Sequence, residues 1–226
     1  MEKYKYIQKY DYSSFIFIIG GAFQGKSLLS IRIAERYTIS TIICTDYLRN
    51  VLRSINPCKE ILRSTSNLDK ISFNRSREII SDLLFKTIHF YALRKEKVII
   101  EGIHFSRDFL KFAVINGAKC ICLENCLPWE KKVELKSLTS PITKIINIDT
   151  GEESLAYHNE NLDTKNNAYL HKRKNFQLVH DIISSDANSL KIEKVSFEDI
   201  DKAFLIIKNI LDKHFPGNHI QCRKLQ

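Results

Sequence analysis

Residues 15–37 read FIFIIGGAFQGKSLLSIRIAERY, and this stretch decides the fold class. A run of large apolar residues ends at two glycines, and apolar residues at helical spacing follow Gly25-Lys26-Ser27. Residues 20–27 match the pattern G-x-x-x-x-G-K-S/T. In that pattern the backbone N–H groups of a glycine-rich loop converge on phosphate oxygens, and the next helix adds its positive N-terminal end. We therefore predict a strand, a phosphate-binding loop and a helix.

The loop and the first residues of the helix are expected to bind a nucleotide. Lys26 is expected to act catalytically by reaching the β- and γ-phosphates of ATP, and Ser27 is expected to bind Mg²⁺. Three of the seven glycines of the chain fall in this loop, which favours a functional loop over a plain strand-to-helix turn. The predicted nucleotide-binding residues are Gly20, Gly21, Ala22, Phe23, Gln24, Gly25, Lys26, Ser27 and Leu28.

Short runs rich in Val and Ile alternate with helical patterns along the rest of the chain. The runs are STIICT (40–45), KVIIEG (97–102) and AKCICLE (118–124), and a helix, a strand and a last helix close the chain. This order predicts an α/β fold of the P-loop NTPase class, with a parallel sheet of about five strands and helices on both faces. We expect one domain over residues 1–215 and a tail at 216–226. Residues 136–167 have weak periodicity and are predicted to be a lid or an insertion.

Two acidic residues follow predicted strands. Asp46 comes directly after the second strand, and Glu101 ends the third. The carboxyl ends of parallel strands form the ligand-binding edge of such a sheet. Asp46 is therefore a candidate to accept a proton from an attacking hydroxyl or to orient it, although it could also only cap the next helix. Glu101 is a candidate to hold Mg²⁺ through water or to orient the nucleophile.

Basic residues near these strand ends suit an anionic acceptor. Arg49 and Arg53 are one helical turn apart, and arginine can hold a carboxylate or phosphate with two hydrogen bonds. His104 follows Glu101 and is either a participant or a satisfied polar residue. Residues 171–174 (HKRK) are consecutive, so at most two can face one ligand. Among them we favour Arg173 or Lys174 as the charge that meets the transferring phosphoryl group.

Three segments together resemble 2-phosphoglycerate kinase and its relatives, which include the kinase-like domain of a plant phytic-acid protein. Residues 45–53 carry the Thr-Asp pair and two spaced arginines of that family, and residues 64–66 its Ser/Thr cluster. Residues 101–105 (EGIHF) are similar to its Glu-Gly-Val-His-Leu strand end. The resemblance covers residues 15–115. It implies an ATP- and Mg²⁺-dependent kinase that transfers the γ-phosphate to a hydroxyl of a small anionic metabolite.

Composition bounds the alternatives. The net charge of +9 favours anionic partners, either phosphorylated metabolites or nucleic acid. A polynucleotide or nucleoside 5′-hydroxyl kinase therefore stays open, as does a nucleotide-binding ATPase switch that has no acceptor. The sequence has no run of 18 apolar residues, and its first residues lack an apolar signal core. We expect no membrane span and a cytoplasmic location.

Overall fold

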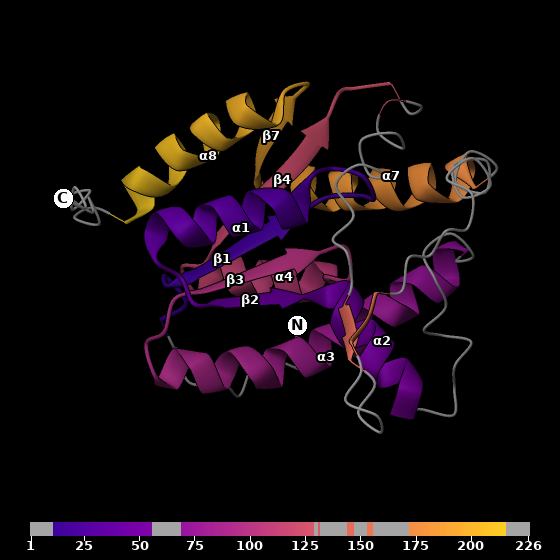
Figure 1. The fold of residues 1–226 in the computed structure, drawn as a ribbon, viewed down its shortest axis with the longest axis horizontal. Coiled ribbons are helices and arrows are strands. Elements are labelled where there is room, and N and C mark those ends of the chain that lie inside the picture. Colours follow the sequence, from indigo (N-terminus) through magenta and orange to yellow (C-terminus); the bar gives the residue numbers. More distant parts are fainter. Residues whose placement is uncertain are drawn as a thin grey trace.

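The structure is a computed structural model that describes residues 11–55, 69–128, 131, 144–146, 153–155 and 172–215. Its centre is a five-stranded sheet in which every pair of neighbouring strands is parallel (Figure 1). The strand order is β2-β3-β1-β4-β7. The strands are β1 (Phe15–Ile19), β2 (Thr41–Cys44), β3 (Val98–Gly102), β4 (Lys119–Asn125) and β7 (Glu193–Phe197). The parallel sheet of about five strands predicted from the sequence is confirmed.

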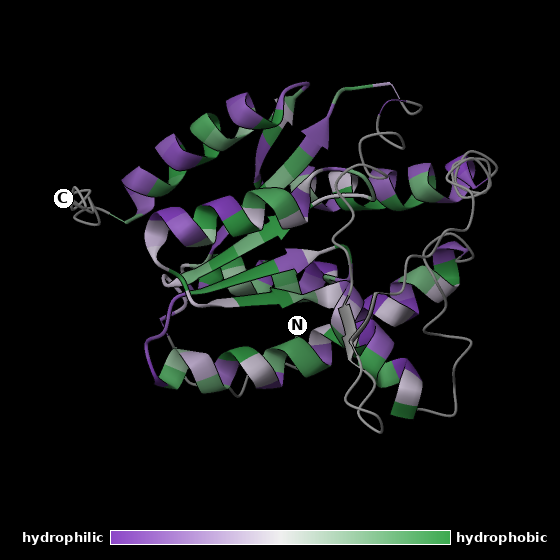
Figure 2. Ribbon diagram, in the orientation of Figure 1, coloured by the Kyte–Doolittle hydropathy of each residue, from purple (hydrophilic) through white to green (hydrophobic). Residues whose placement is uncertain are grey.

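Helices cover both faces of this sheet. One apolar core lies under α1 (Lys26–Tyr37) and α8 (Ile200–His214), and a second lies under α3 (Lys70–Leu93), α4 (Arg107–Ile115) and α7 (Arg173–Ser189). β1 contributes to both cores, because successive side chains of a strand point to opposite faces. This explains the unbroken apolar run of β1, which Figure 2 shows as a green arrow between the helices.

The strand register places the site. Glu101 pairs with Ile18 of β1 on one side and with Cys44 of β2 on the other. β1 leads into the loop at Gly20, and β2 leads directly into α2 (Thr45–Ile55). The carboxylate that ends β3 therefore stands between the phosphate-binding loop and the first turn of α2.

The segment predicted as a lid or insertion holds a small hairpin. Strands β5 (Lys144–Ile146) and β6 (Glu153–Leu155) pair antiparallel and form a separate two-stranded sheet. The rest of residues 136–167 and the predicted tail 216–226 lie outside the described residues. In the part of the chain that the structure describes, no helix has the length and apolar character needed to cross a bilayer.

Candidate active site

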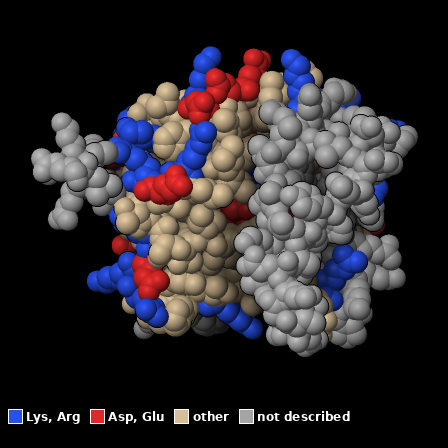
Figure 3. All heavy atoms as spheres, viewed as in Figure 1, with Lys and Arg blue, Asp and Glu red and all other residues tan. Residues whose placement is uncertain are grey.

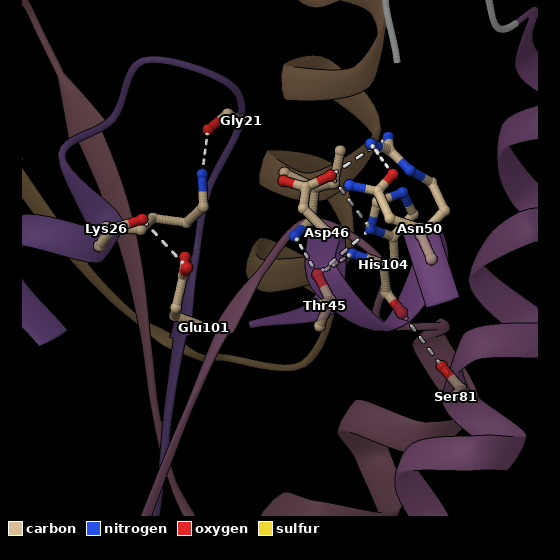
Figure 4. Close-up of polar contacts among 11 residues, drawn as sticks. Gly21, Lys26, Thr45, Asp46, Asn50, Ser81, Glu101 and His104 are labelled. Atoms are coloured by element: carbon tan, nitrogen blue, oxygen red, sulfur yellow. Dashed lines mark hydrogen bonds and ion pairs between the residues drawn. The ribbon is translucent and has the colours of Figure 1, made fainter. Parts of the chain in front are cut away.

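The loop between β1 and α1 has the shape that its sequence predicts. Gly25 has a positive φ of 71°, and a Cβ on it would lie 2.7 Å from Cδ1 of Ile200 on α8. The helix α1 begins without a side-chain cap, so its first N–H groups are left for a ligand. The Nζ of Lys26 donates a hydrogen bond of 2.6 Å to the carbonyl oxygen of Gly21 (Figure 4). The lysine thus folds back over its own loop.

Two residues at variable positions of the loop motif hold the loop against its neighbours. The ring of Phe23 meets the ring of Phe176 on α7 edge to face, with centroids 5.3 Å apart. Gln24 is buried, and its Oε1 accepts a hydrogen bond from the backbone N–H of Asn125 at the end of β4. Both side chains therefore fix the loop in place. No pattern in the sequence indicates these partners, which lie more than 100 residues away.

One hydrogen bond joins the loop to the end of β3. The Oγ of Ser27 donates to Oε1 of Glu101 over 3.0 Å, and Glu101 is buried. Burial, together with the negative charge and hydrogen bonding of Glu101, raises the pKa of the Cys44 thiol to about 12. The hydroxyl and the carboxylate are oxygen ligands of the kind that Mg²⁺ prefers.

Asp46 and Arg49 form the second group of polar residues. An Nη of Arg49 lies 3.2 Å from Oδ1 of Asp46, and the Asp46 side chain is 45% exposed whereas Arg49 is buried. Asp46 lies in the first turn of α2, two residues after Cys44, which pairs with Glu101. Arg53 lies one turn further along α2 and is exposed. The structure therefore brings Arg49, and not Arg53, to the Asp46 carboxylate.

His104 is fully buried between α2 and α3. Burial is the largest cause that lowers the pKa of His104 to about 3, and Arg49, Lys26 and Arg77 lower it further while Asp46 opposes them. The imidazole is therefore neutral near pH 7. A neutral imidazole cannot hold an anionic group by its charge. The neutral state therefore favours the role of a buried polar residue for His104.

The basic segment before α7 is described only in part. His171 lies outside the described residues, while Lys172, Arg173 and Lys174 form the start of the helix. Arg173 is exposed and lies three residues before Phe176, so both belong to one face of α7. Because Phe176 contacts the loop, helical spacing places Arg173 rather than Lys174 on the face of α7 that meets the loop.

A cavity of about 830 Å³ lies between α3, the start of α4 and α7. Arg77 lines it from the buried face of α3, donating its Nε to the carbonyl oxygen of Phe105 over 2.7 Å and pairing with Asp186 of α7. Sequence reasoning missed Arg77, although its spacing from Phe73 and Ile80 places it on the apolar face of the helix. The lining residues are Lys70, Asn74, Arg77, Glu78, Asp82, Ser106, Arg107, Asp108, Leu178, Asp181, Ile182, Ser185 and Asp186.

Comparison with known proteins finds distant similarities. No family model matches the chain. An uncharacterized protein of Dictyostelium discoideum is 26% identical over 214 residues, which cover 86% of this chain and 23% of the relative. The chain therefore spans about a quarter of the length of the curated relative it matches.

Solved structures give weak global superpositions. Shikimate kinase from Acinetobacter baumannii, in complex with shikimate, gives a TM-score of 0.43 at 13% identity and covers 94% of this chain and 97% of that chain. Shikimate kinase from Aquifex aeolicus gives 0.37 at 14%, covering 90% and 99%. A structure from Chloroflexus aurantiacus gives 0.48 at 12%, covering 89% and 97%. The fold class therefore rests on the parallel sheet and the phosphate-binding loop of this chain itself.

Proposed function

We propose that this chain is an ATP-dependent kinase that transfers the γ-phosphate to a hydroxyl of a small anionic metabolite similar to 2-phosphoglycerate. The observation that carries the proposal is the position of Glu101. It holds Ser27 of the phosphate-binding loop on one side and pairs with Cys44 on the other, directly before Thr45 and Asp46. A loop for phosphates and a candidate base therefore share one sheet edge, as a transfer between two bound substrates requires.

Mg²⁺ fits the residues at this edge. The Oγ of Ser27 and the Oε1 of Glu101 already lie 3.0 Å apart. No group of three or more His, Cys, Asp and Glu side chains that could hold a metal occurs among the described residues, and Mg²⁺ commonly uses one or two protein ligands together with phosphate oxygens. When bound, the ion neutralises charge on the β- and γ-phosphates.

The side chains of this protein then have separate tasks. Lys26 exchanges the Gly21 carbonyl oxygen for phosphate oxygens of ATP, and Arg49 holds an anionic group of the acceptor. Asp46 orients the acceptor hydroxyl and takes its proton. The hydroxyl oxygen bonds to the γ-phosphorus as the bond from that phosphorus to the bridging oxygen breaks, and ADP leaves. Positioning and charge stabilisation contribute most of the rate in such a reaction.

The part of the acceptor away from the reacting hydroxyl would lie near the cavity between α3, α4 and α7. Ser106 lines the cavity two residues after His104, which lies beside Asp46. The lining holds five carboxylates and three basic side chains, so it suits hydroxyl or amino groups better than a second phosphate. Arg173, on the α7 face that contacts the loop, is the further residue that we assign to the transferring phosphoryl group.

A nucleic-acid acceptor is supported less well. Figure 3 shows basic and acidic side chains interspersed over α1 and α8 on the face in view, rather than gathered into one basic stripe. A polynucleotide kinase needs a continuous positive track for the phosphate backbone. On this face the mixed charges favour a small acceptor over a long one.

The test is a screen of ATP consumption against hydroxy acids including 2-phosphoglycerate, sugar phosphates, nucleosides and a 5′-hydroxyl oligonucleotide. The Lys26→Ala protein is the blank, after its melting temperature has been compared with that of the wild type. We expect one class of small anionic acceptor to raise ATP consumption in the wild type only. A Lys26→Ala protein that transfers phosphate at the wild-type rate contradicts the proposal.

Two other outcomes would replace it. ATP turnover that no acceptor raises favours a nucleotide-binding switch. Labelling of the oligonucleotide, with binding that weakens steeply as salt is added, favours a polynucleotide kinase.

A further inference from the structure

The hydroxyl of Thr45 connects the first turn of α2 to the end of β3. Thr45 is fully buried and directly precedes Asp46. Its Oγ1 accepts a hydrogen bond of 3.2 Å from the backbone N–H of Ile103 and lies 3.2 Å from Nδ1 of His104 (Figure 4). One side chain therefore contacts two consecutive residues that follow β3.

Gly102 permits this approach. It has a φ of 151°, and a Cβ placed on it would lie 1.7 Å from Oγ1 and 2.8 Å from Cβ of Thr45. Real Cβ atoms do not come this close to other heavy atoms, so any side chain at this position would displace Thr45. The glycine at the end of β3 is needed for the contact with α2.

The hydrogen bond ties the imidazole of His104 to α2. Either Oγ1 of Thr45 or Nδ1 of His104 donates it, depending on the tautomer of the ring. Nε2 is buried and has no hydrogen-bond partner among the described residues. The charged groups that act on the ring are Asp46 and Arg49 on α2, Lys26 on α1 and Arg77 on α3.

The residues after β3 are themselves fixed to α3. Oγ of Ser81 donates to the carbonyl oxygen of His104 over 3.4 Å and accepts the N–H of Ser106 over 2.8 Å. Nε of Arg77 donates to the carbonyl oxygen of Phe105. The residues that Thr45 binds are therefore also held by hydrogen bonds from the long helix α3.

We propose that Thr45, Gly102 and His104, which we call the Thr45 clasp, are positioning residues that fix Asp46 relative to Glu101 and Lys26. His104 acts in it as a neutral hydrogen-bond partner of Thr45 and does not touch substrate. The inference rests on the proposed function, because it assumes that Asp46 orients the acceptor hydroxyl. It extends that function by naming residues that act through Asp46.

The kinetic test compares Thr45→Val, which removes the hydroxyl, with Thr45→Ser, which keeps it. We use MgATP with 2-phosphoglycerate, and also MgATP alone, where water is the acceptor. Displacing a catalytic group by about 1 Å can cost roughly 100-fold in rate. We expect Thr45→Val to lower kcat by about ten- to 100-fold with the KM for ATP changed less than about twofold, and Thr45→Ser to stay within about threefold of wild type. Thr87→Val is the matched control, because among the described residues the Thr87 hydroxyl bonds to Leu83 of its own helix.

A double-mutant cycle separates positioning from a purely structural role. In an Asp46→Asn background, Thr45→Val should lower kcat by less than about twofold further, because Thr45 acts through Asp46. An equal loss in both backgrounds, or equal rates for Thr45→Val and Thr45→Ser, overturns the positioning role and leaves the proposed function standing. A wild-type protein that transfers phosphate neither to 2-phosphoglycerate, nor to any other acceptor of the screen, nor to water overturns both.

A second measurement needs no activity. Nitrogen-15 NMR of the imidazoles should show His104 in its neutral form, without titration between pH 5 and 8, and Thr45→Val should change its Nδ1 shift. A midpoint near the ordinary value of about 6.5, or an Nδ1 shift that Thr45→Val leaves unchanged, overturns the clasp whether or not phosphate is transferred.

Discussion

The two sides of the proposed site, which we assign to the phosphates and to the acceptor, are built in different ways. The phosphate side comes from one stretch, residues 20–27, whose glycines, lysine and serine are adjacent in the sequence. The acceptor side is assembled from the first turn of α2, the end of β3 and the middle of α3. The first is determined by local backbone shape and the second by the register of the sheet. A change on the phosphate side should therefore affect every reaction of ATP, whereas a change on the acceptor side should affect one substrate.

The largest effect is expected from Lys26→Met. Loss of the amine removes the charge that we assign to the phosphates, so phosphate transfer should fall by about 100- to 1,000-fold with every acceptor and with water. Lys86→Met is the control, because Lys86 is exposed on α3. Initial rates of ADP formation measure both. A loss seen with only one acceptor would remove the proposed difference between the two sides.

Arg49→Ala should act on the acceptor side alone. A charge-assisted hydrogen bond contributes about 1.5–3 kcal/mol, so the KM for the acceptor should rise by about tenfold or more while that for ATP stays within about twofold. Arg53→Ala is the matched comparison one turn along α2, where the side chain is exposed. We expect it to change either KM by less than about twofold. Equal effects of the two substitutions would place the acceptor along α2 instead of at its first turn.

Acid should destabilise the fold through His104. Its pKa is lowered to about 3 by burial, and the unfolded chain has the ordinary value of about 6.5. Between these values the unfolded state binds a proton that the folded state does not, so stability is full above pH 6.5 and is lost as the pH falls. We expect a loss of about 2 kcal/mol from pH 7.5 to 5, measured by urea unfolding. His104→Asn lacks the titrating group and should show a smaller loss, and an identical pH dependence would contradict the buried neutral imidazole.

The smallest effect is expected where the phosphate side touches α7. Phe23→Leu removes the edge-to-face contact with Phe176 and should lower the free energy of unfolding by about 1 kcal/mol. Phe23→Gly loses the same ring but relieves the positive φ of 62°, so part of its loss is offset. Urea midpoints of the two variants measure the difference. If Phe23→Gly were much less stable than Phe23→Leu, the inference that the backbone at Phe23 is strained would be wrong.

Local patterns in the sequence predicted the parallel sheet, its flanking helices and the loop between β1 and α1, whose phosphate binding stays a prediction. A continuous run of Val and Ile indicates a strand that is buried on both faces of the sheet. The loop motif lies within eight consecutive residues. The same patterns indicated that Asp46 and Glu101 would follow strand ends, and the register of β2 and β3 brings those ends together.

Contacts between distant residues could not be predicted in this way. Thr45 and Gly102 are 57 positions apart in the sequence. No sequence pattern indicates that a Cβ on Gly102 would overlap the hydroxyl of Thr45. Phe23 and Gln24 depart from the usual loop residues because they contact α7 and β4, which only the folded chain brings near. The strands β5 and β6 have three residues each, too few for an alternating pattern to emerge.

The helix α7 touches both sides of the site through neighbouring residues. A Cβ on Gly21 would lie 3.0 Å from Cβ of His180, and the next residue, Asp181, lines the cavity between α3, α4 and α7. A nucleotide in the loop and an acceptor near the cavity would therefore both constrain one helix. If the first ligand restricts the motion of α7, the second ligand binds at a lower cost in conformational entropy. Thermodynamic reciprocity requires that each ligand raise the affinity for the other by the same factor. We expect the two substrates to bind with synergy, so that the affinity for ATP rises once the acceptor is present.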